Sequence, residues 1–180
     1  MMCSRAELLA TAREMAAIGL VTGTLGNVSC RFGKRVLITP SALDYTAMRP
    51  DDLVVLDLLG NVVVGRRAPS SEHRLHLAIY ARIASAHAIV HTHSPHAVMA
   101  SSALAELPSS GGAAPRGPVP IAPFQPPGTL ELADQAADLM AKQRSNAVLL
   151  ERHGVVGIGA DLRCALQICL EVERLARKSL

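Results

Sequence analysis

The histidines are the scarce reactive side chains of this 180-residue sequence, which contains seven of them. His91 and His93 flank Thr92 directly after the apolar stretch Ala88-Ile89-Val90, a pattern typical of the end of a buried strand. Side chains two positions apart in a strand share a face, so both imidazoles could chelate one cation. The alternative is structural, with one histidine in the core and the other on the surface.

A third histidine strengthens the hypothesis of a metal site. His153 follows another apolar stretch, residues 147–150, and precedes Gly154, which lets the backbone bend close to a ligand. Three protein ligands with one open position are typical of catalytic zinc, whereas structural zinc sites have four protein ligands. Spacing alone leaves open whether the three imidazoles meet.

Glu72 ends the segment Pro69-Ser70-Ser71-Glu72, which predicts the start of a helix with Ser70 or Ser71 as its N-cap. An acidic side chain in the first helical turn interacts favourably with the helix dipole, and this role alone would explain Glu72. The functional interpretation is a carboxylate directed at the metal site, as a fourth ligand or as a general base. The serine hydroxyls and the free N–H groups of the first turn could also bind an anion such as phosphate.

Two loops offer further groups that could bind a ligand. Gly26 and Asn27 lie in a tight loop before a predicted strand, where backbone N–H groups can point at a ligand. Ser41 supplies a hydroxyl in the turn Thr39-Pro40-Ser41-Ala42. The alternative for both segments is a simple turn without a ligand.

Hydrophobic periodicity predicts the elements that would position these residues. The expected helices cover residues 5–18, 70–85, 129–144 and 162 onward, and another helix opens at Pro95. The expected strands cover residues 28–32, 35–39, 53–57, 62–64, 88–91, 147–151 and 155–158. Residues 106–128 are rich in Pro, Gly and Ser and are expected to form a long functional or interfacial loop. Hairpins mixed with helices favour helices packed on a largely antiparallel or mixed sheet.

The composition fits a single globular domain over residues 1–180. Hydrophobic residues make up 49% and charged residues 18% of the chain, which excludes a disordered protein. Aromatic residues make up only 2%, so the chain offers few platforms for stacked bases, and no nucleic-acid partner is expected. The sequence contains no long uncharged apolar run, so no membrane-spanning helix is expected. No signal peptide is expected either, because Arg13 and Glu14 interrupt the only candidate apolar stretch near the N-terminus.

The sequence has four cysteines, and none forms a Cys-x-x-Cys motif: Cys3, Cys30, Cys164 and Cys169. This spacing favours small buried apolar thiols over a disulfide framework or a zinc site. A reduced state is typical of the cytoplasm, which is therefore the expected location.

The motifs taken together resemble the class II aldolase/adducin family over nearly the whole chain. They are Gly23-Thr24-Leu25-Gly26-Asn27-Val28-Ser29, Ile38-Thr39-Pro40-Ser41, Pro69-Ser70-Ser71-Glu72 with His76, Val90-His91-Thr92-His93, Pro126-Pro127-Gly128-Thr129 and Arg152-His153-Gly154. Their order and approximate spacing carry the resemblance, since no single segment is specific. It implies an α/β fold of three α/β/α layers with a mainly antiparallel central sheet, usually assembled as a homotetramer.

The resemblance also implies a divalent metal, zinc in the best-known members, with manganese or cobalt also possible. The residues that match its ligands are His91, His93 and His153. Glu72 matches the catalytic glutamate of the family, which can also approach the metal in the empty site. The positions that hold the substrate phosphate are matched by Gly26, Asn27, Ser41, Ser70 and Ser71. His76 matches a common family position to which no chemistry is assigned.

The implied reaction is cleavage of a ketose 1-phosphate to dihydroxyacetone phosphate and an aldehyde, with a metal-stabilised enediolate. Fuculose-type members use a tyrosine near the aldehyde oxygen, whereas residues 108–112 place glycine there and Tyr45 and Tyr80 lie elsewhere. The chain also stops at Leu180 without the tail that covers the site in that enzyme. Both departures favour a broad-specificity aldolase, for a substrate such as a 5-deoxy- or methylthio-pentulose 1-phosphate. The glycine-rich segment 111–128 is then expected to give the aldehyde pocket small or apolar walls.

Three further reactions of the family could use the same site. They are dehydration of methylthioribulose 1-phosphate, 4-epimerisation of ribulose 5-phosphate and decarboxylation of oxo-tetronate phosphates. The missing tyrosine and tail argue against the epimerase. A non-catalytic binding module like the adducin head domain is the alternative from another functional class.

Overall fold

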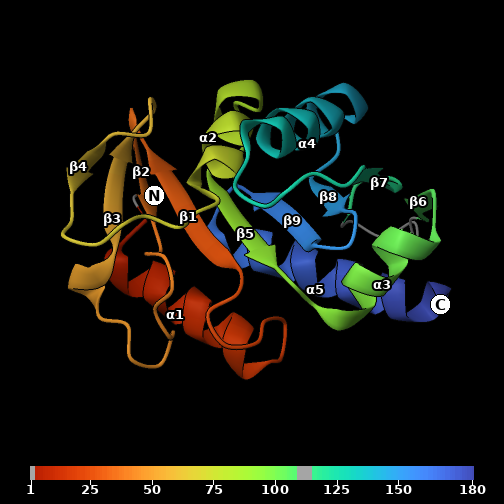
Figure 1. Cartoon of the computed structure of the whole chain (residues 1–180), viewed down its shortest axis with the longest axis horizontal. Coiled ribbons are helices and arrows are strands. Elements are labelled where there is room, and N and C mark those ends of the chain that lie inside the picture. The colour runs from red at the N-terminus through yellow and green to blue at the C-terminus, as the bar shows by residue number, and fades with distance from the viewer. Residues whose placement is uncertain (1–2, 109–114) are drawn as a thin grey trace.

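The computed structural model describes residues 3–108 and 115–180, which form one sheet with helices on both faces (Figure 1). The strands are β1 (Asn27–Phe32), β2 (Arg35–Ile38), β3 (Val54–Asp57), β4 (Val62–Val64), β5 (Ala88–Thr92), β6 (Glu106–Leu107), β7 (Val119–Ala122), β8 (Ala147–Leu150) and β9 (Gly154–Gly159). The helices are α1 (Arg5–Ala17), α2 (His73–Arg82), α3 (Pro95–Ala103), α4 (Leu130–Gln143) and α5 (Leu162–Ser179), with a short 3-10 helix, η1 (Pro50–Asp52).

The sheet is antiparallel apart from one strand pair. Its order is β4-β3-β2-β1-β5-β9-β8-β7-β6, and only β7 and β8 run parallel among the described strands. Helices α1, α3 and α5 cover one face, and α2 and α4 cover the other (Figure 1). The expected three-layer α/β/α architecture with a mainly antiparallel sheet is therefore confirmed.

Alternating side chains of the central strands create two apolar cores. On β5, Ala88 and Val90 pack towards α1, α3 and α5, whereas Ile89 packs towards α2 and α4. On β8, Leu149 and Leu150 divide between the same two cores. This division follows from the period of two in a strand, and it explains why these strands read as continuous apolar runs.

Two expected elements differ in the structure. Helix α2 begins at His73 rather than near Ser70, because Ser70 N–H donates to the Thr39 carbonyl and keeps the preceding chain extended. The N-cap position is consequently occupied by Glu72, not by either serine. Residues 106–128 are not only a loop, since β6 and β7 lie within them, and β7 includes Pro120. Sequence patterns miss such a strand because proline lacks the N–H that a ladder needs.

The cysteine expectation is wrong for one pair. Cys3 and Cys30 form a disulfide, with Cα atoms 6.4 Å apart. Helix α1 packs along β1, which brings Cys3, just before the helix, beside Cys30 on the strand. Of the two free cysteines in the described residues, Cys169 is buried as expected, but Cys164 is exposed.

Substitution of Cys3 by Ser is expected to lower the free energy of unfolding by about 3 to 4 kcal/mol under oxidising conditions. The disulfide closes a loop between residues separated by 27 positions, so its loss frees the unfolded chain. Urea titration of the oxidised proteins measures the difference, with Cys164→Ser as the matched control at a free, exposed thiol. Equal midpoints for wild type and Cys3→Ser without reductant would contradict the disulfide.

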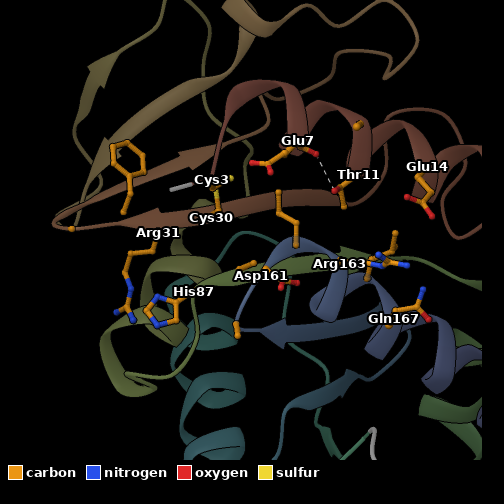
Figure 2. Close-up of a pocket in the computed structure, with 17 residues that line it drawn as sticks. Cys3, Glu7, Thr11, Glu14, Cys30, Arg31, His87, Asp161, Arg163 and Gln167 are labelled. Atoms are coloured by element: carbon orange, nitrogen blue, oxygen red, sulfur yellow. Dashed lines mark hydrogen bonds between the residues drawn. A yellow bond between two sulfur atoms is a disulfide. The ribbon is translucent and has the colours of Figure 1, made fainter. Parts of the chain in front are cut away.

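The disulfide lies at a cavity of about 1040 Å³ (Figure 2). Its walls come from α1, from β1 and from the start of α5, and include Arg31, His87 and Arg163. None of Glu72, His91, His93 and His153 lines it, so it is separate from the predicted metal site. Within residues 3–108 and 115–180, no helix has the length and apolar character that crossing a membrane requires.

Candidate metal centre

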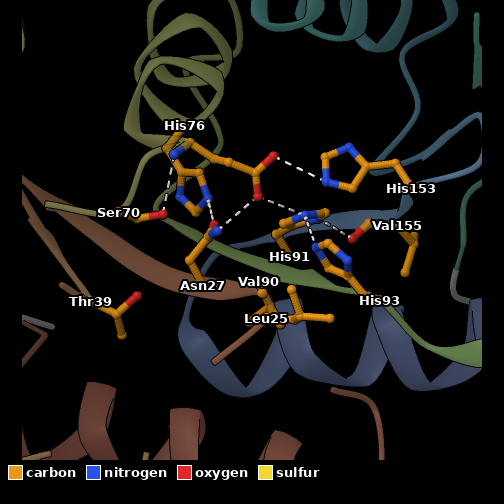
Figure 3. A network of polar contacts seen from close by, with 12 residues as sticks. Leu25, Asn27, Thr39, Ser70, His76, Val90, His91, His93, His153 and Val155 are labelled. Atoms are coloured by element: carbon orange, nitrogen blue, oxygen red, sulfur yellow. Dashed lines mark hydrogen bonds and ion pairs between the residues drawn. The ribbon is translucent and has the colours of Figure 1, made fainter. Parts of the chain in front are cut away.

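The three predicted histidines meet where the central strands end. His91 lies on β5, His93 follows that strand, and His153 lies in the turn between β8 and β9. Strand pairing places His91 opposite Val156 of β9, which brings that turn alongside β5. The three ring centroids lie 4.7 to 4.9 Å apart. Figure 3 shows the rings facing a common space from these separate elements.

Glu72 joins the histidines at the start of α2. Its side chain is buried, and its Oε2 lies 3.0 Å from His91 Nε2. One ligand atom from each of Glu72, His91, His93 and His153 lies within 4.8 Å of all the others. The structure therefore brings together the complete predicted set of metal ligands and the predicted glutamate.

A backbone carbonyl fixes the orientation of His91. The carbonyl oxygen of Val155 lies 3.0 Å from His91 Nδ1, and because a carbonyl only accepts, Nδ1 carries the proton. His91 Nε2 then faces Glu72 Oε2 and His93 Nε2, each 3.0 Å away. Once His91 Nε2 carries no proton, its lone pair is available to a cation between these atoms. A carbonyl that orients an imidazole in this way is typical of metal-binding histidines.

The charges of the cluster are strongly coupled. Burial alone would raise the pKa of Glu72, but His91 and His153 beside it lower the pKa well below its usual range. Burial alone would lower the pKa of His91, but Glu72 raises it. Burial and the neighbouring His91 and His153 lower the pKa of His93 to about 3, so this ring is neutral at pH 7. A carboxylate and a neutral imidazole are the forms that bind cations.

Unpaired buried atoms test whether a cation fits. Glu72 Oε1 and both ring nitrogens of His153 are buried without a hydrogen-bond partner among the described residues. His153 Nε2 is 3.2 Å from Glu72 Oε1, a short contact but not an aligned hydrogen bond. Buried polar atoms are normally paired, so the unpaired Glu72 Oε1 and His153 Nε2, which face each other within the cluster, fit a bound cation. Three imidazoles with a carboxylate suit zinc, and manganese or cobalt also accept these ligand types.

Gly26 and Asn27 lie directly against the cluster. Asn27 is opposite His91 in the β1–β5 pairing, and its Nδ2 donates to Glu72 Oε2 over 3.1 Å. Gly26 has φ +75°, and a Cβ there would lie 2.6 Å from the His91 carbonyl oxygen. The hydroxyl of Tyr45 donates to the Gly26 carbonyl and holds this loop in place. The turn is therefore a closely packed part of the site.

Replacement of Gly26 by Ala is expected to cost about 2 to 4 kcal/mol of folding free energy, because left-handed strain adds to a backbone clash. Gly33→Ala is the matched control, since Gly33 has φ +58° with nothing within 4 Å of the added Cβ. It is expected to cost about 1 to 2 kcal/mol, from strain alone. Thermal unfolding of both variants measures the difference, and equal losses would contradict the close approach to His91.

The three predicted serines gather before α2. A bridge between Pro40 and Pro69 and a hydrogen bond from Ser41 N–H to the Ala68 carbonyl bring the two serine segments side by side. Ser70 is buried, and its hydroxyl accepts the N–H of Glu72 over 3.2 Å. Ser41 and Ser71 are exposed residues of these two segments.

The two tyrosines do not replace the tyrosine of the fuculose-type enzymes. Both are buried, and their hydroxyls are hydrogen-bonded, Tyr45 to backbone carbonyls and Tyr80 to Ser29. Burial raises the pKa of both phenols. The predicted glycine position near residue 112 lies outside the described residues, which stop at 108 and resume at 115.

The sequence assigned no role to His76, although the structure makes it a neighbour of the site. His76 is fully buried and its Nε2 lies 2.5 Å from Asn27 Oδ1 (Figure 3). The sequence signal that could have placed His76 near the site is its position four residues after Glu72, since residues four apart lie on the same face of a helix.

Comparison with known proteins identifies the family of the chain. Residues 6–180 match the sequence model of the Class II Aldolase and Adducin N-terminal domain. The chain belongs to this family. The order of motifs, the three-layer fold and the His–Glu cluster all agree with membership of the class II aldolase and adducin family.

Proteins similar to this chain include sugar-phosphate aldolases. A 5-deoxy-D-ribulose 1-phosphate aldolase of Bacillus thuringiensis is 40% identical over 177 residues, which cover 96% of this chain and 82% of the relative. An L-fuculose phosphate aldolase of Escherichia coli is 35% identical over 174 residues, 95% of this chain and 80% of the relative. The solved structure of an L-fuculose 1-phosphate aldolase superimposes on this chain with a TM-score of 0.92 and 35% sequence identity. The match covers 99% of this chain and 86% of the chain of that aldolase.

Proposed function

We propose that the chain is a divalent-metal-dependent aldolase that cleaves a ketose 1-phosphate to dihydroxyacetone phosphate and an aldehyde. The observation that carries the proposal is the buried Glu72 carboxylate facing three imidazoles, with the Asn27 amide beside it. Aldolase relatives that share about 80% of their length with the chain support the reaction type. Zinc is the proposed metal, held by His91, His93 and His153, and manganese and cobalt are the next candidates.

The phosphate would bind beside the N-terminus of α2. Gly26, Asn27, Ser41, Ser70 and Ser71 are the proposed ligands. The exposed serines and the backbone N–H groups of the first helical turn can donate to phosphate oxygens, and the helix dipole favours the negative charge. Binding the phosphate at a fixed point orients the rest of the sugar towards the histidines.

Cleavage breaks the bond between C3 and C4, turns the C4 hydroxyl into the aldehyde and leaves the electron pair on the phosphate-bearing fragment as an enediolate. A divalent cation at the histidines would supply the positive charge that stabilises this anion. The C4 hydroxyl loses its proton as the aldehyde forms. Glu72, which starts as a carboxylate, would take up one proton and deliver it to C3, and would remove it again in the synthetic direction. Its Oε1 is the atom free for this transfer, since Oε2 already accepts from Asn27.

The proposed substrates are 5-deoxy- and 5-methylthio-pentulose 1-phosphates. The 5-deoxy-D-ribulose 1-phosphate aldolase is 40% identical, and a 5-methylthioribulose-1-phosphate/5-deoxyribulose-1-phosphate aldolase of Rhodospirillum rubrum is 36% identical over 97% of this chain. These substrates yield aldehydes with an apolar end. The engaged hydroxyls of Tyr45 and Tyr80 are consistent with an aldehyde pocket that does not use a tyrosine.

A substrate panel tests the reaction and its specificity together. Metal-loaded protein is incubated with the 1-phosphates of 5-deoxyribulose, 5-methylthioribulose, ribulose and fuculose, and release of dihydroxyacetone phosphate is followed. The 5-deoxy and methylthio substrates are expected to give the highest kcat/KM. Loss of water from methylthioribulose 1-phosphate without dihydroxyacetone phosphate would establish a dehydratase. Ribulose 5-phosphate and an oxo-tetronate phosphate are incubated separately. An epimerised product from the first would establish a 4-epimerase, and carbon dioxide from the second would establish a decarboxylase.

The proposal also covers assembly and location. A homotetramer in the cytoplasm is proposed from the family resemblance and from the sugar-phosphate substrates of the relatives. Light scattering of the purified protein tests the tetramer. The Cys3–Cys30 disulfide is unusual for a reducing cytoplasm, so alkylation of free thiols in intact cells tests the proposed location. An adducin-like binding module would instead contain no stoichiometric metal.

A further inference from the structure

A line of buried polar side chains leads from the middle of the molecule to Glu72. Ser29 on β1 lies 2.6 Å from His76 Nδ1, and His76 Nε2 lies 2.5 Å from Asn27 Oδ1. Asn27 Nδ2 in turn donates to Glu72 Oε2 over 3.1 Å. Figure 3 shows His76 and Asn27 side by side, with Asn27 pointing towards the histidine cluster. Ser29 and His76 are both completely buried, so neither exchanges these partners for water.

Each hydrogen bond in this line has a defined direction. A carboxylate can only accept, so the Asn27 amide must turn its nitrogen to Glu72 and its oxygen to His76. The oxygen of Asn27 also only accepts, so His76 Nε2 must carry the ring proton. His76 Nδ1 is then the acceptor, and the Ser29 hydroxyl donates to it. Tyr80, 2.8 Å from Ser29, can complete the hydrogen bonding of that hydroxyl but does not set the direction.

The ring of His76 is neutral, as these directions require. Burial, together with the nearby His91, lowers the pKa of His76 to about 3. A neutral imidazole carries one proton, and its two nitrogens therefore have opposite roles. A ring with the proton on Nδ1 would present a lone pair to Asn27 and would favour the flipped amide.

The flipped amide would damage the site. It would place the Asn27 oxygen against the Glu72 carboxylate, where two negative oxygen atoms would face each other without a proton between them. The observed amide instead stabilises Oε2 of Glu72 and leaves Oε1 for other partners. An amide nitrogen carries two N–H groups, so the same orientation leaves the second one for a substrate oxygen.

We propose that His76 is a positioning residue, which holds the Asn27 amide nitrogen towards Glu72 through its Nε2–H tautomer, with Ser29 as the donor that selects this tautomer. His76 itself does not reach the cluster of metal ligands, so its effect passes through Asn27. The catalytic consequence rests on the proposed function, in which Glu72 exchanges a proton with the substrate.

The tautomer is tested directly by long-range ¹H–¹⁵N correlation spectra of zinc-loaded protein labelled in the histidine rings. The His76 signals are assigned by their loss in His76→Gln. Wild type and Tyr80→Phe are expected to show the Nε2–H form of His76, whereas Ser29→Ala is expected to show at least partial Nδ1–H form. Each of these two variants removes one buried hydroxyl, so they are matched in size and burial. An Nδ1–H ring in wild type, or an unchanged His76 tautomer in Ser29→Ala, would overturn the proposal.

Kinetics test the effect on the reaction with a matched pair at the same position. Gln can place an amide N–H near the position of the imidazole Nε2, whereas Leu has a similar size and no donor. His76→Leu is expected to lower kcat/KM by about 10- to 100-fold, and His76→Gln by no more than about 5-fold. Equal losses in both variants, at matched metal content, would show a packing role and overturn the proposal.

The two readouts separate failure of the positioning role from failure of the proposed function. The spectra need no turnover, so they decide the tautomer even if the substrate panel releases no dihydroxyacetone phosphate. An active wild type with equal His76→Leu and His76→Gln kinetics would leave the aldolase intact and remove only the role of His76.

Discussion

Glu72→Gln is expected to lower kcat by about 10²- to 10⁴-fold while metal remains bound at wild-type stoichiometry. Gln keeps the size of the side chain and can still accept from Asn27, but it cannot exchange a proton with a substrate carbon. The three imidazoles that would hold the metal are unchanged in this variant. Chemistry is therefore lost without loss of the cation.

The measurement combines steady-state kinetics on the best substrate of the panel with metal analysis of the same protein samples. Glu131→Gln is the control, because Glu131 is an exposed acidic side chain in the first turn of α4. If Glu72 serves mainly as a fourth ligand, metal content falls in parallel with activity. Turnover at the wild-type level would remove Glu72 as the proton-transfer group altogether.

The local sequence predicted the strands that carry the histidines, because their apolar periodicity was sufficient for that. Buried strands before His91 and His153 ended as expected, and strand pairing brought them together. The identity of the partner strands could not be predicted from spacing, because β5 pairs with β9, which lies far along the chain. Only the family resemblance joined the three imidazoles in advance.

Longer-range contacts explain what the sequence did not predict. The Cys3–Cys30 disulfide depends on α1 lying along β1, and no local pattern encodes that contact. The start of α2 depends on a backbone hydrogen bond between Ser70 and Thr39, which overrides the N-cap preference of serine. The spacing of His76 after Glu72 placed it near the site without indicating a role, because its partners Ser29 and Asn27 lie on another element, β1.

His153→Ala is expected to lower metal affinity by about 100-fold or more and to reduce kcat/KM in proportion to the metal lost. A catalytic site with three protein ligands keeps little affinity when one of them is removed. His153 is the informative choice, because its ring nitrogens have no hydrogen-bond partner among the described residues. His91→Ala would also break the bond to the Val155 carbonyl and so mix structural with metal effects.

Two measurements test this loss of metal affinity. The first is metal analysis of the dialysed protein, and the second is thermal unfolding with and without chelator. A ligand present at about 1,000 times its dissociation constant stabilises the native state by about 4 kcal/mol, so chelator should lower the Tm of wild type clearly. The Tm of His153→Ala should respond little, since the variant has little metal to lose. His87→Ala is the control, because His87 is exposed at the separate cavity between α1 and α5. If His153→Ala keeps its metal and its response to chelator, the cation does not depend on His153. That outcome would rule out a site made of the three imidazoles.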